Sequence, residues 1–582
     1  MRRYWVVALA VLALLGVLSP PAFSQAPTPK VTITGILDTV TSWNKNFNQT
    51  SPGGDITNAR EEEWYTRHRF RPDFIMEVGK AKAVWGVEMD VAWGQASFSD
   101  TGIAGSALGS SSKVGTTANF DLNTDTLVVV ETKWLYVDFP VPMVPVPTQL
   151  TLGAQPWAAT FKPGIFATGD YPGVNMVTTW TPAVKTHFAY AQIEERLTAA
   201  SESATTSPFN RGDDFAIILS AEVTPMKGLD VRPIYSYAYY NGTTNGASRA
   251  NVGGLLGTGV QATYFKTDTT NDIATPNGRT AFRPDDKENR HTIGIDSRWK
   301  WGNLSVDPTL MYQWGSRQTS AYGCASAGQS TGTSVNCDGF ATAATGGHSS
   351  KTADISAWLV DLRASYQWGP LNIGVLYMYT SGNNARVSVR DAISYFQPIS
   401  TDTLYTVGWS ELLTAGVDYL TQMHTGAVPG NPLSMGNTIG YDKYGRHGFT
   451  VRGIYDLTPA WSLRAIVSPM WTAQKVDTNT TTACVGNPFC YGYSVTPAGF
   501  APVAEGDSRY LGTELDFGFT WRFAPGLTLD GVYGVLFAGS ARDVIDASPD
   551  QRSGASRANP IGSSPQDAKD VYLATMRIRY SF

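Results

Sequence analysis

Charged side chains recur at every second position on two neighbouring segments of the sequence. One face of residues 64–78 carries Arg67, Arg69, Arg71, Asp73 and Glu77, and one face of residues 83–95 carries Glu88 and Asp90. Side chains two apart on a β-strand share a face, so a turn at residues 79–82 would bring the two rows together. Arg71 would then lie opposite Glu88 or Asp90, according to the register. Such a row either sets an electric field that favours anions and orients dipolar solutes, or pairs internally and holds a wall in shape.

The N-terminal segment indicates that the chain is exported. Arg2 and Arg3 precede a short apolar run, and residues 22–24 (Ala-Phe-Ser) form a small-x-small cleavage site. The apolar run is shorter than the roughly 18 residues that a membrane-spanning helix needs, which favours a cleaved signal peptide over residues 1–24. The rest of the chain, residues 25–582, has no other continuously apolar stretch of that length. It therefore either is soluble or crosses a membrane as a β-barrel.

The sequence gives little support to catalytic, metal or cofactor chemistry. None of its 6 histidines lies in a recognised nucleophile or metal motif. Its four cysteines lie in polar loop sequence, and no histidine stands near either pair at ligand spacing: Cys324, Cys337, Cys484 and Cys490. Four cysteines allow three pairings, and in an oxidising compartment we expect the local ones, Cys324 with Cys337 and Cys484 with Cys490. We expect no enzyme activity, no metal, no cofactor and no nucleic-acid partner.

The last thirteen residues alternate between apolar and polar side chains. Tyr572, Ala574, Met576, Ile578, Tyr580 and Phe582 share one face, and Thr575, Arg577, Arg579 and Ser581 share the other. This pattern is typical of a strand with lipid outside and a wet lumen inside. The segment resembles the C-terminal strand of bacterial outer-membrane β-barrel proteins. That resemblance implies a Gram-negative-type outer-membrane location, contact with outer-membrane lipid, and recognition of a terminal Phe582 by the barrel-assembly machinery.

Similar alternating segments recur along the chain, and the connections between them alternate between short and long. Eighteen segments fit the pattern: residues 31–43, 64–78, 83–95, 127–139, 148–155, 174–180, 183–194, 213–223, 229–240, 291–301, 304–314, 355–368, 371–380, 447–456, 461–473, 510–523, 527–538 and 570–582. They predict an all-β, antiparallel, up-and-down transmembrane barrel with short periplasmic turns and long extracellular loops. Reading residues 174–194 as a loop would give 16 strands, but we favour 18. Closing the barrel would place Arg577 and Arg579 one strand beyond the first strand, extending the arginine row.

Aromatic residues gather at the ends of the segments. Trp299, Trp301, Trp368, Trp461, Trp521, Phe523 and Phe582 lie beside short connections, and Trp64, Trp93, Trp314 and Trp471 lie beside long ones. Two such groups are the pattern of the two interfacial girdles of a membrane barrel. A soluble β-sandwich would bury these residues centrally.

Two connections could narrow the interior of the barrel. Residues 155–170 are unusually apolar for an exposed loop, and residues 381–445 are long enough to enter the lumen. Packing against a neighbouring loop or subunit is the alternative for each, and the sequence does not choose between them.

The resemblance to bacterial outer-membrane porins extends, as architecture, over the whole chain. It implies a water-filled channel for passive diffusion of small hydrophilic solutes or ions, tuned by lumen charge, in a homo-oligomer that is a trimer in that family. We expect the pore lining to include Arg67, Arg69, Arg71, Asp73, Glu88, Asp90, Arg577 and Arg579. The alternative is a structural or surface-array barrel with a largely closed lumen that presents its extracellular loops.

Overall fold

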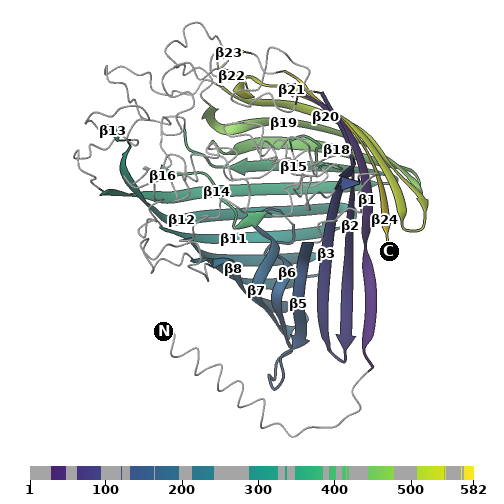
Figure 1. The fold of residues 1–582 in the computed structure, drawn as a ribbon, viewed down its shortest axis with the longest axis vertical. Coiled ribbons are helices and arrows are strands. Elements are labelled where there is room, and N and C mark those ends of the chain that lie inside the picture. Colours follow the sequence, from purple (N-terminus) through teal and green to yellow (C-terminus); the bar gives the residue numbers. More distant parts are fainter. Residues whose placement is uncertain are drawn as a thin grey trace.

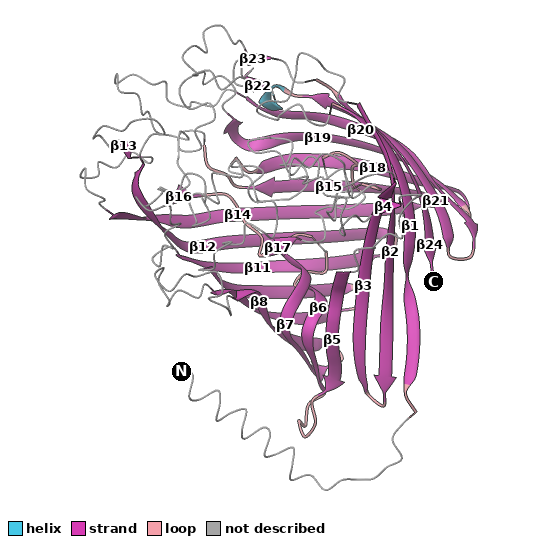
Figure 2. Ribbon diagram, in the orientation of Figure 1, coloured by secondary structure: helices cyan, strands magenta, loops and turns pink. Residues whose placement is uncertain are grey.

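The computed structural model describes residues 28–46, 62–93, 119–120, 131–162, 164–195, 213–240, 287–324, 335–336, 348–384, 392–401, 409–413, 416–417, 444–476, 508–542, 544–545, 565–566 and 569–582. Strands make up nearly all of this part of the chain, as Figure 2 shows. None of the helices found among these residues is long and apolar enough to cross a membrane.

Eighteen antiparallel strands form one closed barrel. They are β1 (Lys30–Lys45), β2 (Glu62–Val78), β3 (Ala81–Trp93), β5 (Glu131–Pro140), β6 (Thr148–Ala158), β7 (Ala167–Thr181), β8 (Val184–Glu195), β9 (Asp213–Met226), β10 (Leu229–Tyr240), β11 (Lys287–Trp301), β12 (Leu304–Cys324), β14 (His348–Trp368), β15 (Leu371–Thr380), β18 (Arg446–Thr458), β19 (Trp461–Val476), β20 (Ser508–Ala524), β21 (Leu527–Ala538) and β24 (Val571–Ser581). The predicted fold class is confirmed, with 18 strands rather than 16. The hairpin that was least regular in sequence is β7–β8.

Short elements lie in the connections between these strands. They are β4 (Asn119–Phe120), β13 (Val335–Asn336), β16 (Ala392–Ile393), β17 (Ser400–Thr401), β22 (Val544–Ile545), β23 (Pro565–Gln566) and a 3-10 helix (Ser540–Arg542). Of these, β17 pairs in parallel with the start of β7, so a late connection reaches an early strand.

The barrel closes where the last strand pairs with the first. β24 runs antiparallel to β1 along ten residue pairs, and the two strands lie side by side in Figure 1. The seam ends in reciprocal hydrogen bonds between Gly35 and Phe582, with N···O distances of 2.9 and 3.1 Å. The predicted tight turns after β11 and β14 contain Gly302 and Gly369 at φ of 58° and 54°. A backbone in this left-handed region favours glycine because it has no Cβ.

The outer face of the barrel is apolar. On β24 the exposed side chains are Met576, Ile578 and Tyr580, while Arg577 and Arg579 face the other way and contact carboxylates. The girdle residues of the short-turn ends pack together, since Trp461 stacks on Trp521 with ring centroids 5.0 Å apart and Trp299 lies against Trp301 at 6.2 Å. This outward apolar surface is what a lipid bilayer requires.

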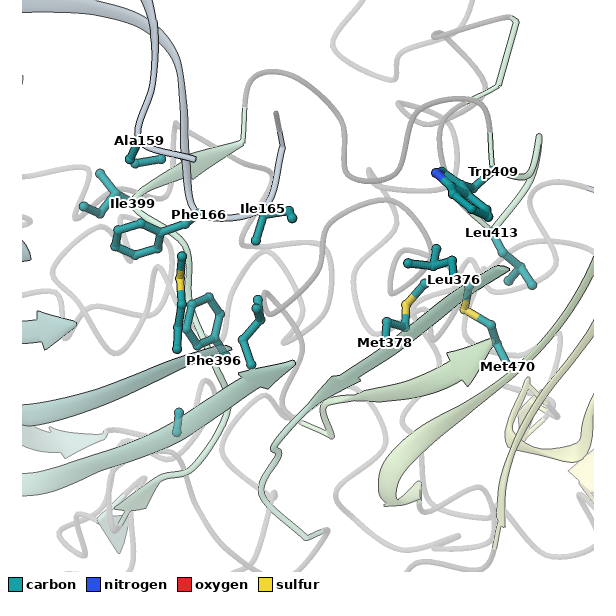
Figure 3. Close-up of a cluster of buried hydrophobic side chains, with 14 of the residues drawn as sticks. Ala159, Ile165, Phe166, Leu376, Met378, Phe396, Ile399, Trp409, Leu413 and Met470 are labelled. Carbon is teal, nitrogen blue, oxygen red and sulfur yellow. The ribbon is translucent and has the colours of Figure 1, made fainter. Parts of the chain in front are cut away.

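The inner face is not uniform. Over β8 to β15 it carries buried small and apolar side chains, including Ala189, Ala216, Ala357, Leu376 and Met378, among buried charged ones such as Asp296, Arg317 and Asp361. Figure 3 shows loop side chains packed there: Phe166 with Phe396 and Ile399, and, apart from them, Trp409 and Leu413 near Leu376, Met378 and Met470. We refer to this apolar inner surface as the loop platform. The opposite part of the inner face, from β24 through β1, β2 and β3 to β5, is charged.

Candidate functional site

The charged part of the inner face begins at the seam between β24 and β1. Asp38 lies in register with Arg579 on one side and with Arg69 on the other. Arg579 donates two hydrogen bonds to the Asp38 carboxylate, at 2.6 and 2.5 Å. Two residues further along β1, Val40 lies between Arg577 and Arg67, and Arg577 pairs with Asp530 at 2.7 Å. The seam thus joins the arginines of the last strand to those of the second.

Glu88 is the centre of the neighbouring group of charges. Its carboxylate lies 3.0 Å from Arg69, 3.0 Å from Arg71 and 3.2 Å from Lys133. The register places Asp90 opposite Arg69 and Asp73 opposite Gly86. Lys133 also pairs with Asp170 at 2.9 Å, so these three cations contact two carboxylates. We call the set Asp38, Arg67, Arg69, Arg71, Asp73, Glu88, Lys133, Arg577 and Arg579 the charged wall.

Lys133 is a member of the charged wall that the sequence pattern did not indicate. On β5, Leu135 and Val137 are exposed on the outer face, so strict alternation would also send Lys133 outward. The register between β3 and β5 shifts between Gly86 and Val87, and this irregularity lets Lys133 reach Glu88. A lysine at a lipid-facing position is costly, and this cost was the available signal.

Two arginines of the charged wall, Arg71 and Arg579, are clearly more accessible than the carboxylates that they contact. The exposed side-chain fractions are 32% for Arg579, 26% for Arg71 and 19% for Lys133, against 0% for Asp38 and 7% for Glu88. In contrast, Arg317 on β12 is 1% exposed beneath a loop. Arg67 is also almost fully buried. Lys133 is about as accessible as its second partner Asp170, which is 21% exposed, so the accessible cations over buried carboxylates are the guanidinium groups of Arg71 and Arg579.

The first candidate connection packs inside the barrel. Residues 159–167 include Ile165, Phe166 and Ala167, all fully buried. Lys162 lies 3.2 Å from Asp361 and 3.6 Å from Asp296, on β14 and β11, and donates to the Asp307 carbonyl at 2.5 Å.

The ring of the neighbouring Phe161 lies under two guanidinium groups. These belong to Arg232 and Arg298, at 4.2 and 4.4 Å from the ring centroid. This connection is thus held by charges on strands across the interior from its own.

The second candidate connection also enters the interior and contacts the first. Ile399 donates its N–H to the Phe166 carbonyl at 2.9 Å, next to the β17–β7 pairing. Gln397 accepts hydrogen bonds from Arg290 and Arg317, both buried, and these two arginines share Glu288. The described parts of both connections singled out by sequence therefore lie in the barrel.

A later part of the same connection is fixed to β20 by carboxylates. Glu514 accepts the backbone N–H groups of Glu411, Leu412 and Leu413 at 2.6 to 2.7 Å. The Glu411 carboxylate in turn pairs with Arg464 on β19 at 2.8 Å. We call residues 409–413 and 416–417 the latch segments.

Several sequence predictions fall outside the described part of the chain. Residues 1–24, predicted as a signal peptide, are outside it, as are Cys337, Cys484 and Cys490. Cys324 ends β12, but its side chain is not among those described, nor is that of Asp90. Among the described residues, no group of three or more His, Cys, Asp or Glu side chains is arranged to hold a metal ion.

Comparisons with known proteins find similar solved structures. OccAB4 of Acinetobacter baumannii is 10% identical, covering 96% of this chain and 99% of that one, with a TM-score of 0.43. OccK8 (OprE) of Pseudomonas aeruginosa is 10% identical over 95% and 98% of the two chains, with a TM-score of 0.43. The outer membrane protein OprD of Pseudomonas aeruginosa is 9% identical over 96% and 95%, with a TM-score of 0.42. No protein-family model and no curated protein matches the chain.

Proposed function

We propose that this protein is an outer-membrane porin, a passive channel for small hydrophilic solutes or ions. A closed barrel of 18 strands with an apolar outer face suits a bilayer, and barrels of about this strand number leave an aqueous interior. The inward connections lie on the loop platform and leave charged side chains of the opposite wall partly accessible. The accessible charges line the passage that remains and act on whatever crosses it.

The observation that carries a preference for anions is the unequal exposure across the charged wall. The carboxylates Asp38, Glu88 and Asp530 are buried behind the cations that they bind. A solute in the passage would therefore meet Arg71 and Arg579 before the carboxylates behind them. Fixed cations in a narrow, low-dielectric passage lower the barrier for anions and raise it for cations.

The test is reconstitution of the purified protein in planar bilayers. We expect stepwise conductance and, under a salt gradient, a reversal potential that shows anion preference. The double variant Arg71→Gln/Arg579→Gln should conduct but lose most of that preference. Lys30→Gln, which removes a largely exposed cation at the start of β1, is the matched control and should leave the preference unchanged. Conductance with equal selectivity in all three proteins would keep the channel and refute the role of the charged wall.

The structural alternative has its own support, because two connections occupy part of the lumen. A surface barrel with a closed lumen would present its extracellular loops and pass no ions. A folded barrel that gives no conductance steps in bilayers would favour this alternative over a porin.

We further propose the cellular setting implied by the chain. Residues 1–24 would direct export and be removed, which the N-terminal sequence of the mature protein would show. The last strand would be read by the barrel-assembly machinery through Phe582. Assembly into a homotrimer is also a proposal, and the mass of the detergent-solubilised protein tests it.

A further inference from the structure

The second inward connection is attached to the barrel in two chemically different ways. Residues 394–399 are held near β11 and β12 by Arg290 and Arg317, which together contact one carboxylate, Glu288. The latch segments are held by an excess of carboxyl groups. Glu411, Glu514 and Asp516 are all fully buried and lie within one network of contacts.

Full ionisation of the three carboxyl groups is unfavourable in this arrangement. One oxygen of Glu514 accepts the Glu411 N–H at 2.7 Å, and the Oδ1 atom of Asp516 is buried without a hydrogen-bond partner. Asp516 also accepts the Glu411 N–H at 3.1 Å, while the Glu411 carboxylate accepts the N–H of Val417 at 2.6 Å. Like charges at this separation, away from water, strongly disfavour full ionisation.

The surrounding cations do not balance three negative charges. Arg464 on β19 pairs with Glu411, and Arg577 on β24 donates to the Val417 carbonyl at 3.3 Å but is already paired with Asp530 on β21. Arg452 on β18 lies over the Trp409 ring at 4.3 Å, with Arg363 on β14 nearby. Within the network itself, full ionisation would leave three carboxylates against Arg464. One retained proton reduces this excess.

We propose that the latch segments are a proton-dependent latch. They are docked on the inner face of the barrel while the carboxyl cluster of Glu411, Glu514 and Asp516 holds a proton, and they are released when the cluster loses that proton. This regulation rests on the proposed channel function, and release would widen the passage beside Arg577 of the charged wall. Two glycines on the inner face of the barrel lie close to the latch segments in the docked form. A Cβ on Gly374 would lie 3.1 Å from the Trp409 ring, and one on Gly534 would lie 3.6 Å from the Cβ of Glu411 and 2.6 Å from Asp516.

The direction of the pH response follows from linkage. Burial raises the pKa of the Glu411 carboxyl, against the opposing effect of Arg464, and Glu514 raises it further. A carboxyl whose pKa is higher in the docked form favours docking at low pH, and this contribution is lost as pH rises through the raised pKa. The attachment of residues 394–399 through Arg290 and Arg317 has no surplus carboxylate. We therefore expect these residues to stay in place as the pH rises.

The first experiment is single-channel conductance between about pH 5 and about pH 8, a range that spans raised carboxyl pKa values. We expect the conductance of the wild-type protein to step upward as pH rises. Asp516→Asn keeps the shape and an oxygen that can accept the Glu411 N–H but has no proton to lose, so the step should be absent and the low conductance should persist. Glu411→Gln, which also removes one negative charge, should behave in the same way. Asp456→Asn, a change on β18 where the partner is Ser462, should retain the step.

The second experiment does not depend on conductance. Leu413 is 1% exposed in the docked form, so a Leu413→Cys thiol should be labelled faster at the higher pH, read on the peptide that holds residue 413. The ratio of this rate to the rate in an Asp516→Asn background cancels the ionisation of the thiol itself. A ratio that does not rise with pH would overturn the latch, as would a conductance step that survives Asp516→Asn. Labelling that rises with pH in a barrel without conductance would keep the latch and refute the proposed channel.

Discussion

At the scale of single residues, the Glu88 carboxylate offsets the positive charge of three neighbouring cations. Arg69, Arg71 and Lys133 all lie within about one hydrogen-bond length of its carboxylate. A buried anion between three cations screens them from solutes and holds them in one geometry. The field in the passage therefore depends on a group that solutes scarcely touch.

Glu88→Gln tests this arrangement. The substitution removes one negative charge and leaves the three cations in place, with Asp170 still 2.9 Å from Lys133. We expect a stronger anion preference in the reversal potential and tighter block by small dicarboxylates. Glu77→Gln is the matched control. Glu77 lies on the same predicted face of β2 as Arg69 and Arg71, but it pairs with the exposed Lys30 at 3.5 Å. A shift toward cations in Glu88→Gln would show that the three cations had moved away from the passage.

At the scale of elements, the barrel positions the inward connections by contacts across the interior. Lys162 and Asp361 are 199 residues apart in sequence. Asp296 receives the Phe161 N–H at 2.5 Å as well as the Thr309 hydroxyl at 2.6 Å. The position of the first connection therefore depends on the carboxylates of Asp296 on β11 and Asp361 on β14.

Lys162→Met should loosen the first connection. It leaves the buried carboxylates Asp296 and Asp361 with one cation fewer, and removing one partner of a buried ion pair costs about 3–5 kcal/mol. We expect a lower melting temperature and larger, noisier conductance steps. Lys162→Arg keeps the charge and should stay near wild type in both measurements. Unchanged steps and unchanged melting in the methionine variant would mean that Phe161 and its two arginines suffice to hold the connection.

The strands were predictable from sequence, whereas most of the contacts between them and the loops were not. Alternation on a strand such as β24 is a local signal, because lipid on one side and water on the other impose a period of two. Lys133 was missed because one shifted register reverses the facing of a residue. Arg464 on β19 pairs with Glu411, which lies on a connection 53 residues away in sequence. Whether a loop folds inward depends on such distant partners, which no local pattern records.

At the scale of the whole molecule, the seam between β1 and β24 turns an open sheet into a barrel. Phe582 contributes two backbone hydrogen bonds to Gly35, and its ring lies 6.1 Å from Phe70 and 5.6 Å from Tyr580. The terminal residue therefore has a structural role in the folded protein in addition to the proposed recognition by the assembly machinery. The two roles make different predictions for a shortened chain.

Deletion of Phe582 should destabilise the seam even where no assembly machinery is present. Two hydrogen bonds of about 1 kcal/mol each and one aromatic contact of about 0.5–1.5 kcal/mol would be lost. We expect a smaller folded fraction after refolding in detergent micelles, measured by heat-modifiable gel mobility, and Phe582→Tyr should refold like wild type. If the shortened chain refolds normally in micelles but fails in cells, Phe582 acts through recognition alone. A loss in micelles that matches the loss in cells would instead assign its effect to closure of the barrel, because the last strand can seal the sheet only when its end is fixed to β1.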